Sequence, residues 1–94
     1  MKGYFIGRIN VHNQESYKEY AKKAGEAVKK FGGNFLARGG KHQIMEGLEH
    51  TRHVIIEFKD FQTAVNFYNS KEYSEARAIR KNKAEFNGVI VEGT

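Results

Sequence analysis

The sequence contains no cysteine and no proline, and it has no apolar run of membrane-spanning length. The absence of cysteine excludes disulfide bridges, thiolate metal sites and cysteine nucleophiles, and it leaves the redox compartment open. A membrane span needs about 18 consecutive apolar residues, and residues 1–4 lack the apolar core of a signal peptide. We therefore expect a soluble, cytoplasmic protein without a membrane partner.

The length and composition of the chain indicate one small, basic domain. At 94 residues it is near the lower size at which a core supports itself, so we treat residues 1–94 as a single domain. Seven phenylalanines and five tyrosines supply large side chains for that core, and a partner subunit would extend it. The formal net charge is +5, but the lysines alternate with glutamates along helix-like segments. That mixture is typical of a solvated helix surface rather than a nucleic-acid contact.

Hydrophobic periodicity predicts the order strand, helix, strand, strand, helix, strand. Apolar residues alternate over residues 3–11, which indicates a strand. A helix capped by Asn13 follows, with apolar residues three and four apart, and it ends at Gly32 and Gly33. The second helix begins after Asp60, restarts at Ser70 and ends at about residue 81. The other strands are predicted at residues 34–38, 52–58 and 85–92, with a short additional strand at 43–46.

This order, with right-handed crossovers, predicts an α+β ferredoxin-like βαββαβ fold with a four-stranded antiparallel sheet. Both helices cover one face, toward which Val54, Ile56 and Phe58 should point. The other face should carry a mixed set: Ile6, Arg8, Asn10, Asn34, Leu36, Arg38, His53, Ile55 and Glu57. That set is too apolar to be only solvated and too charged for a dry core. We infer a homodimer in which a second sheet covers this face and encloses a cavity.

Several stretches give the chain a family resemblance. They are the first-strand start at residues 2–4, the helical Tyr17–Tyr20, the segment GGNFLARGG at 32–40, the pair Glu46-Gly47, the strand RHVIIEF at 52–58, the segment YSEAR at 73–77 and the ending VIVEG at 89–93. On these residues the chain resembles the DUF1330 family, within the dimeric α/β-barrel (ferredoxin-like) superfamily. The resemblance covers nearly the whole chain and implies a fold and a dimer. It implies no reaction, because that superfamily includes monooxygenases, lactone isomerases and haem enzymes.

Gly39 and Gly40 follow a predicted strand and precede another extended segment. A phosphate-binding loop instead requires G-x-x-x-x-G-K-[ST] leading into a helix. The two glycines are therefore expected to form a β-bulge or bend that curls the strand.

Arg38 has two compatible interpretations. It either forms an ion pair with Glu57 across neighbouring strands, or it anchors the carboxylate or enolate of a small ligand in the cavity. Asn34, Arg8 and Tyr4 are expected to line the same cavity, so the ligand predicted from these donors is a small organic anion.

His53 and Glu57 are the candidates for proton transfer, because a histidine with a pKa near 6.5 can act as a general base. A hydrogen-bonded pocket histidine is the alternative. His50 and His53 are three residues apart on an extended chain, so they should point to opposite faces, and His42 and His12 have no evident companions. No metal site and no cofactor are predicted.

Two functional hypotheses remain from the sequence. One is a cofactor-free enzyme that acts on a small acidic or oxygenated organic molecule. The other is a non-catalytic dimeric protein that binds a small ligand in the same cavity. An RNA-binding role is disfavoured, because residues 53, 55 and 57 would stand where an RNA-recognition sheet presents stacking aromatics.

Overall fold

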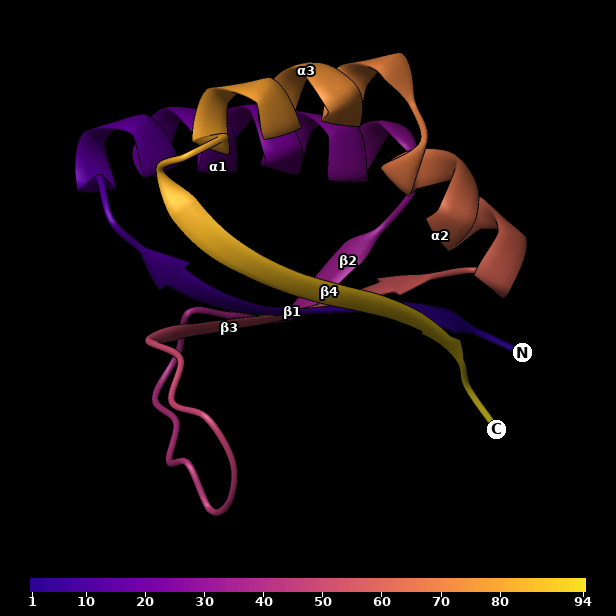
Figure 1. The fold of residues 1–94 in the computed structure, drawn as a ribbon. Coiled ribbons are helices and arrows are strands. Elements are labelled where there is room, and N and C mark those ends of the chain that lie inside the picture. The colour runs from indigo at the N-terminus through magenta and orange to yellow at the C-terminus, as the bar shows by residue number, and fades with distance from the viewer.

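The computed structural model describes residues 1–94, and its elements follow the predicted order, with the second helix divided in two at Ser70 (Figure 1). The four strands are β1 (Gly3–Val11), β2 (Asn34–Arg38), β3 (Arg52–Phe58) and β4 (Ala84–Glu92). The three helices are α1 (Gln14–Lys30), α2 (Phe61–Tyr68) and α3 (Lys71–Arg80). None of these helices is long and apolar enough to cross a membrane.

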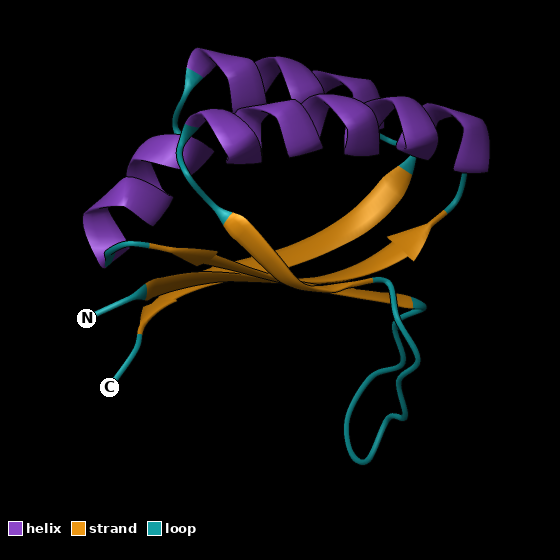
Figure 2. Cartoon of the chain, turned by 180° about the vertical axis from the view of Figure 1, so that it is seen from behind, coloured by secondary structure: helices purple, strands orange, loops and turns teal.

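The strands form one antiparallel sheet in the order β2-β3-β1-β4, and all helices lie on the same side of it (Figure 2). The predicted α+β ferredoxin-like fold is confirmed. Residues 43–46 form no strand, since the whole segment between β2 and β3 is an irregular loop. This loop, residues 39–51, hangs from the helix-free side of the sheet (Figures 1 and 2).

Helix boundaries follow from caps that the sequence already carries. The Asn13 side chain accepts a hydrogen bond from the Ser16 amide at the start of α1. The Ser70 hydroxyl accepts one from the Tyr73 amide, which separates α2 from α3. Gly32 has a φ of 71°, a left-handed conformation that glycine adopts without a Cβ penalty, and it ends α1.

The core lies between the helices and the sheet. Val54, Ile56 and Phe58 face the helices as predicted and are buried. Phe67 of α2 is fully buried at the centre and packs its ring against those of Phe5 and Phe58. Burying one such side chain contributes about 1.5–3 kcal/mol, so each ring of this aromatic layer contributes measurably to stability.

The register of β2 contains a β-bulge that the sequence did not reveal. Phe35 pairs with Ile56, but Ala37 pairs with the adjacent Ile55, so Leu36 is the extra residue. Because side chains alternate with a period of two, the extra residue reverses the face of everything after it. Arg38 therefore pairs with Val54 and lies on the helix side, and its predicted place on the helix-free face is wrong. The expected bend follows at Gly39, whose φ is 70° and whose amide donates to the His53 carbonyl.

Candidate functional site

The helix-free face of the sheet, called the open face below, carries the candidate site. Its side chains come from all four strands: Tyr4, Ile6, Arg8 and Asn10 of β1; Asn34 and Ala37 of β2; His53, Ile55 and Glu57 of β3; and Glu85, Asn87, Val89 and Val91 of β4. Polar residues gather at its two ends and aliphatic residues occupy its middle. The loop end lies beside residues 39–51, and the terminal end lies beside the chain termini (Figure 1).

At the loop end, side chains of β1 fasten the returning arm of the loop. Arg8 donates from Nη2 to the Leu48 carbonyl at 2.8 Å. Asn10 donates to the Glu49 carbonyl at 3.3 Å and accepts from the Thr51 amide at 3.0 Å. The loop is therefore held against the sheet, and Arg8 lies at the junction between the two.

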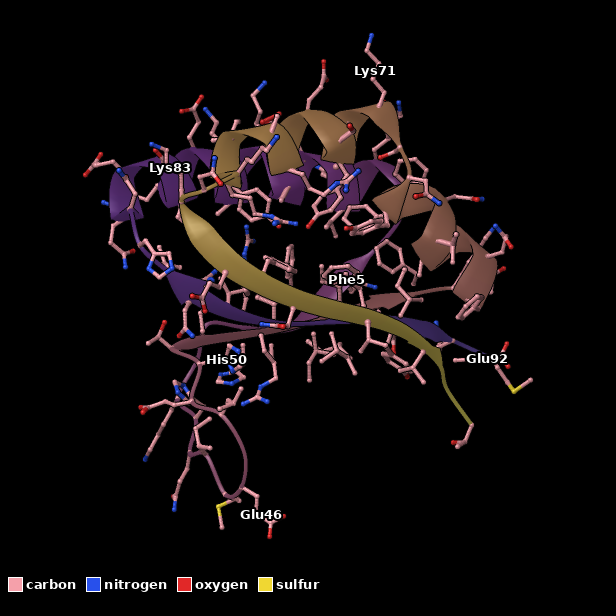
Figure 3. All side chains as sticks on the ribbon, viewed as in Figure 1. Phe5, Glu46, His50, Lys71, Lys83 and Glu92 are labelled. Carbon is pink, nitrogen blue, oxygen red and sulfur yellow. The ribbon has the colours of Figure 1, made fainter.

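Three histidines gather around this junction. The ring centroids of His42 and His53 lie 4.4 Å apart, so His42 has a companion that was not evident from the sequence. His50 is in the loop rather than on β3, so strand alternation does not apply to it, and its Nε2 lies 3.1 Å from the Asn87 amide nitrogen. Figure 3 shows His50 where the loop joins the sheet and Glu46 at the far tip of the loop.

An open hollow of about 400 Å³ lies between the outgoing arm of the loop and the sheet. Arg8 and His53 form its wall on the sheet side, and residues 42–46 form the other wall. Glu46, at the loop tip, is the one carboxylate that lines it. The base of the hollow is thus cationic or neutral.

His53 is tuned toward its neutral form. Burial lowers its pKa from the ordinary 6.5, and the positive charges of His42, Arg8 and His50 lower it further. Its Nδ1 is buried and has no hydrogen-bond partner within the chain. Because Nδ1 is enclosed, the neutral imidazole would accept a proton or a hydrogen bond from a ligand at Nε2.

The terminal end of the open face carries a carboxylate whose charge is paired. The Tyr4 hydroxyl donates to Glu57 Oε2 at 3.2 Å, and Lys2 Nζ lies 3.9 Å from Glu57 Oε1. Burial raises the pKa of the Tyr4 hydroxyl, and the hydrogen bond to the Glu57 carboxylate raises it further. Asn34 pairs with Glu57 from β2 and is exposed.

The structure does not bring Arg38 and Glu57 together, so the predicted ion pair is wrong. Arg38 donates from Nη2 to the Ala21 carbonyl of α1 at 3.3 Å, and its guanidinium stacks 4.0 Å from the centroid of the Phe35 ring. The bulge in β2 is the physical reason, because it turns Arg38 to the opposite side of the sheet from Glu57.

His53 and Glu57 share the open face but not one site. They are four residues apart on one strand, which is about 13 Å at the rise of a β-strand. Ile55 lies between them on the same face. A single small group cannot contact both, so the two predicted proton-transfer residues belong to different ends.

The contribution of β4 to the open face was not predicted from the sequence. Asn87, Val89 and Val91 alternate along the strand and lie opposite Arg8, Ile6 and Tyr4. The alternation was visible, but the face that it occupies depends on which strand β4 pairs with. No group of three histidine or carboxylate side chains is arranged to hold a metal ion.

Comparisons with known proteins agree with this architecture. A family model described as "Domain of unknown function (DUF1330)" matches residues 2–94. No curated protein sequence matches significantly.

Solved structures share the fold at low identity. A protein of unknown function from Rhodopseudomonas palustris is 15% identical with a TM-score of 0.79, over 99% of this chain and 82% of that chain. A dimeric ferredoxin-like protein of unknown function from Jannaschia sp. CCS1 is 10% identical with a TM-score of 0.76, over 99% and 100%. SnoaB, a cofactor-independent oxygenase from Streptomyces nogalater, is 6% identical with a TM-score of 0.63, over 99% and 93%.

Proposed function

The chain belongs to the DUF1330 family, and from this premise and its open face we propose that it forms a homodimer that binds a small organic anion between two sheets. The dimer is supported by the aliphatic middle of the open face, where Val89 and Val91 are 55% and 45% exposed beside Ile6 and Ile55. Apolar patches of this kind are uncommon on monomers. A structural neighbour with the same fold is described as dimeric, which gives the arrangement a precedent.

One observation carries the choice of an anion: Arg8, His42 and His53 converge on one hollow whose sheet side has no carboxylate. Arg8 forms no ion pair, and its contact with the Leu48 carbonyl is made by Nη2. The rest of the guanidinium is available for the charge-assisted hydrogen bonds that carboxylates accept. Ile6, Ile55 and Val89 extend from this point as an apolar wall for the ligand body. Arg38, on the other side of the sheet, has no part in this site, and Tyr4 and Asn34 lie at its distant end.

For a catalytic role, we infer proton abstraction from a small oxygenated acid without a cofactor. Neutral His53 would take a proton from the carbon next to a carbonyl, and the electron pair of the broken C–H bond would move onto the carbonyl oxygen. Arg8 would stabilise the resulting enolate. One protein with this fold is a cofactor-independent oxygenase, so the fold is compatible with such chemistry.

The second candidate is a binding protein without catalysis. It is favoured by the absence of an orienting group on His53, whose Nδ1 has no partner and whose nearest same-strand carboxylate, Glu57, interacts with Tyr4 instead. Catalytic histidines are usually held by such a partner.

The binding site is tested by titrating benzoate into the protein by calorimetry. Arg8→Gln should raise the dissociation constant about tenfold or more, since a charge-assisted hydrogen bond is lost. Asn10→Ala is the matched control, because it also loosens the loop but removes no charge. Equal affinity in wild type and Arg8→Gln would remove the anion-binding role of Arg8.

The two functional hypotheses separate by exchange in deuterated water. Phenylpyruvate has an exchangeable C–H next to its carbonyl, and the catalytic hypothesis predicts that the protein accelerates its deuteration as seen by NMR. His53→Gln should abolish the acceleration while retaining benzoate binding. Binding without acceleration would leave the non-catalytic role.

A further inference from the structure

A second set of hollows lies on the helix side of the sheet, between α3 and the edge strand β4. Two adjoining hollows of about 430 and 360 Å³ meet there, and Arg80 and Tyr68 line both of them. The first has an apolar floor that includes Phe86 and Gly88, and the second includes Arg77. We call this region the α3–β4 groove. It lies on the opposite side of the sheet from the open face.

Gly88 lines the floor of the groove and is paired with a second glycine. Gly88 of β4 pairs with Gly7 of β1, on the face that Phe5, Ile9 and Phe86 also occupy. A Cβ on Gly88 would lie 3.3 Å from the Phe5 ring and 3.4 Å from the Phe86 ring, so even alanine would narrow the space. Glycine weakens a strand interior and often marks a close approach of another group. The absence of a side chain at Gly88 lets the rings of Phe5 and Phe86 pack close to the strand backbone, and the three residues together line the floor.

Two arginines without counter-ions stand over this floor. Arg77 and Arg80 are three residues apart on α3, so they project from the same helix face. Arg80 stacks 3.9 Å from the Phe86 ring centroid, and Arg77 stacks 4.5 Å from that of Tyr68. Neither arginine forms an ion pair, and both Nε atoms are buried without a hydrogen-bond partner. Arg77 Nη1 donates to the Tyr68 hydroxyl at 3.3 Å. A guanidinium stacked on a ring can still offer its remaining N–H groups to a planar anion.

The acidic residues near α3 are engaged elsewhere. Glu72 pairs with Lys30, and Glu75 lines a different hollow against α1. Glu85, the first acid of β4, lies on the open face and contacts His12. Lys81 adds a further positive charge to the wall of the groove, and Figure 3 shows Lys83 where α3 gives way to β4. The groove is therefore cationic over an apolar, aromatic floor.

We propose that the α3–β4 groove binds an aromatic carboxylate. The carboxylate accepts hydrogen bonds from the guanidinium groups of Arg80 and Arg77, and the ring lies on the apolar floor beside Gly88 and Phe86. Each hollow falls within the range of about 300–1,000 Å³ that is typical of small-molecule sites. The site is separate from the one proposed on the open face and does not depend on dimer formation.

Naphthoate is the probe, with naphthalenemethanol as its neutral analogue and inorganic phosphate as an anion without an apolar body. Two-dimensional amide NMR should show that naphthoate shifts the resonances of Gly88, Phe86 and Arg80, whereas the neutral analogue and phosphate shift them much less. Loss of one charge-assisted contact in Arg80→Gln should raise the dissociation constant about tenfold.

Arg38→Gln is the matched control, because it removes one stacked arginine from the helix side at the other edge of the sheet and should leave the affinity unchanged. Arg80→Gln also removes the stacking on Phe86 that supports the fold. Gly88→Ala therefore provides a second variant, which keeps both arginines and narrows the floor. It should also weaken binding.

The proposal fails if naphthoate does not bind, if it shifts only Arg8 and His53, or if Arg80→Gln and Gly88→Ala both bind as wild type does. Arg8→Gln separates the two sites: shifts at Gly88 that persist in Arg8→Gln support the groove whatever happens on the open face.

Discussion

The two faces of the sheet use the same alternating strands for different ends. The helix-covered face presents Phe5, Ile9, Ile56 and Phe58, which are at most 4% exposed and make a closed aromatic and aliphatic core. The open face presents similar aliphatic residues in its middle, but it adds Arg8 and polar groups at both ends, and its valines remain half exposed. Alternation sets which residues share a face, whereas the position of the helices determines which face is covered. The open face, which no helix covers, is the one that can pack against a partner and bind a ligand.

The largest expected effect on the free energy of unfolding comes from a substitution on the helix-covered face. Phe67→Ala removes a fully buried ring at the centre of the core and should lower the free energy of unfolding by about 3–5 kcal/mol. Urea denaturation followed by circular dichroism measures this. Phe61→Ala, at a site that is 39% exposed, is the control and should have a much smaller effect. Similar losses in both variants would contradict the contrast between core and surface.

A substitution on the open face should change the oligomeric state rather than the stability of the fold. Val89→Asp places a charge in the middle of the open face and should convert a species of two chains into one of a single chain, because an unpaired charge in an apolar interface is strongly unfavourable. Sedimentation at micromolar concentration measures the mass. Lys71→Ala makes the same change in net charge on exposed α3 and should leave the mass unaltered. If the wild-type protein sediments with the mass of a single chain, the proposed dimer is wrong.

Alanine substitutions at two glycines compare a crowded position in the core with an open position on the surface, because each adds one methyl group. A Cβ on Gly33 would lie 2.7 Å from the Phe58 ring and 2.8 Å from Val28 Cγ1, whereas one on Gly40 would meet nothing within 4 Å. Gly33→Ala should therefore destabilise by about 1–3 kcal/mol through overpacking. Gly40→Ala should stay within about 0.5 kcal/mol of wild type. Equal midpoints of urea unfolding would show that the covered face relaxes freely around Gly33.

A double-mutant cycle tests the pairing at the terminal end of the open face. Tyr4→Phe and Glu57→Gln should be coupled by about 0.5–1.5 kcal/mol, because each removes one side of the same hydrogen bond. Arg38→Met and Glu57→Gln should be additive, since the two groups lie on opposite sides of the sheet. Coupling in the second cycle would restore the ion pair that the sequence suggested.

The smallest effect is a change of stability with pH at the loop end. His53 has a lowered pKa in the folded protein, so the unfolded chain binds more protons below the ordinary value of 6.5. This contribution to stability is complete above 6.5 and is lost as the pH falls through the folded pKa. Urea midpoints measured from about pH 7.5 to about pH 5.5 should fall less in His53→Gln than in wild type. His12→Gln, at an exposed site, should follow wild type.

The sequence was sufficient for most of the fold because its signals are local. Asn13, Ser70 and Gly32 cap or end helices at the predicted places, and the alternation in β1 and β3 assigns their faces correctly. The bulge at Leu36 could not be predicted, since it appears only when β2 is paired with β3. That one residue moved Arg38 out of the predicted site.

The site was predictable only for residues on regular strands. Arg8 and His53 lie opposite one another across β1 and β3, as strict alternation allows. His42 and His50 come from the irregular loop, whose path depends on contacts with Arg8, Asn10 and Asn87, so no spacing rule finds them. Their proximity to His53 is a product of tertiary structure.

The central position of β1 has a consequence for how the chain reaches this structure. β1 pairs on one side with β3 and on the other with β4, where Gly3 lies opposite Glu92. The first strand to be synthesised therefore keeps an unpaired hydrogen-bonding edge until the last strand arrives. Pairings that distant in sequence form slowly, because most of the chain must be ordered before they are gained. Until then, residues 3–11 are an exposed apolar strand that other protein molecules can pair with. During folding, β4 therefore competes with strands of other molecules for the free edge of β1.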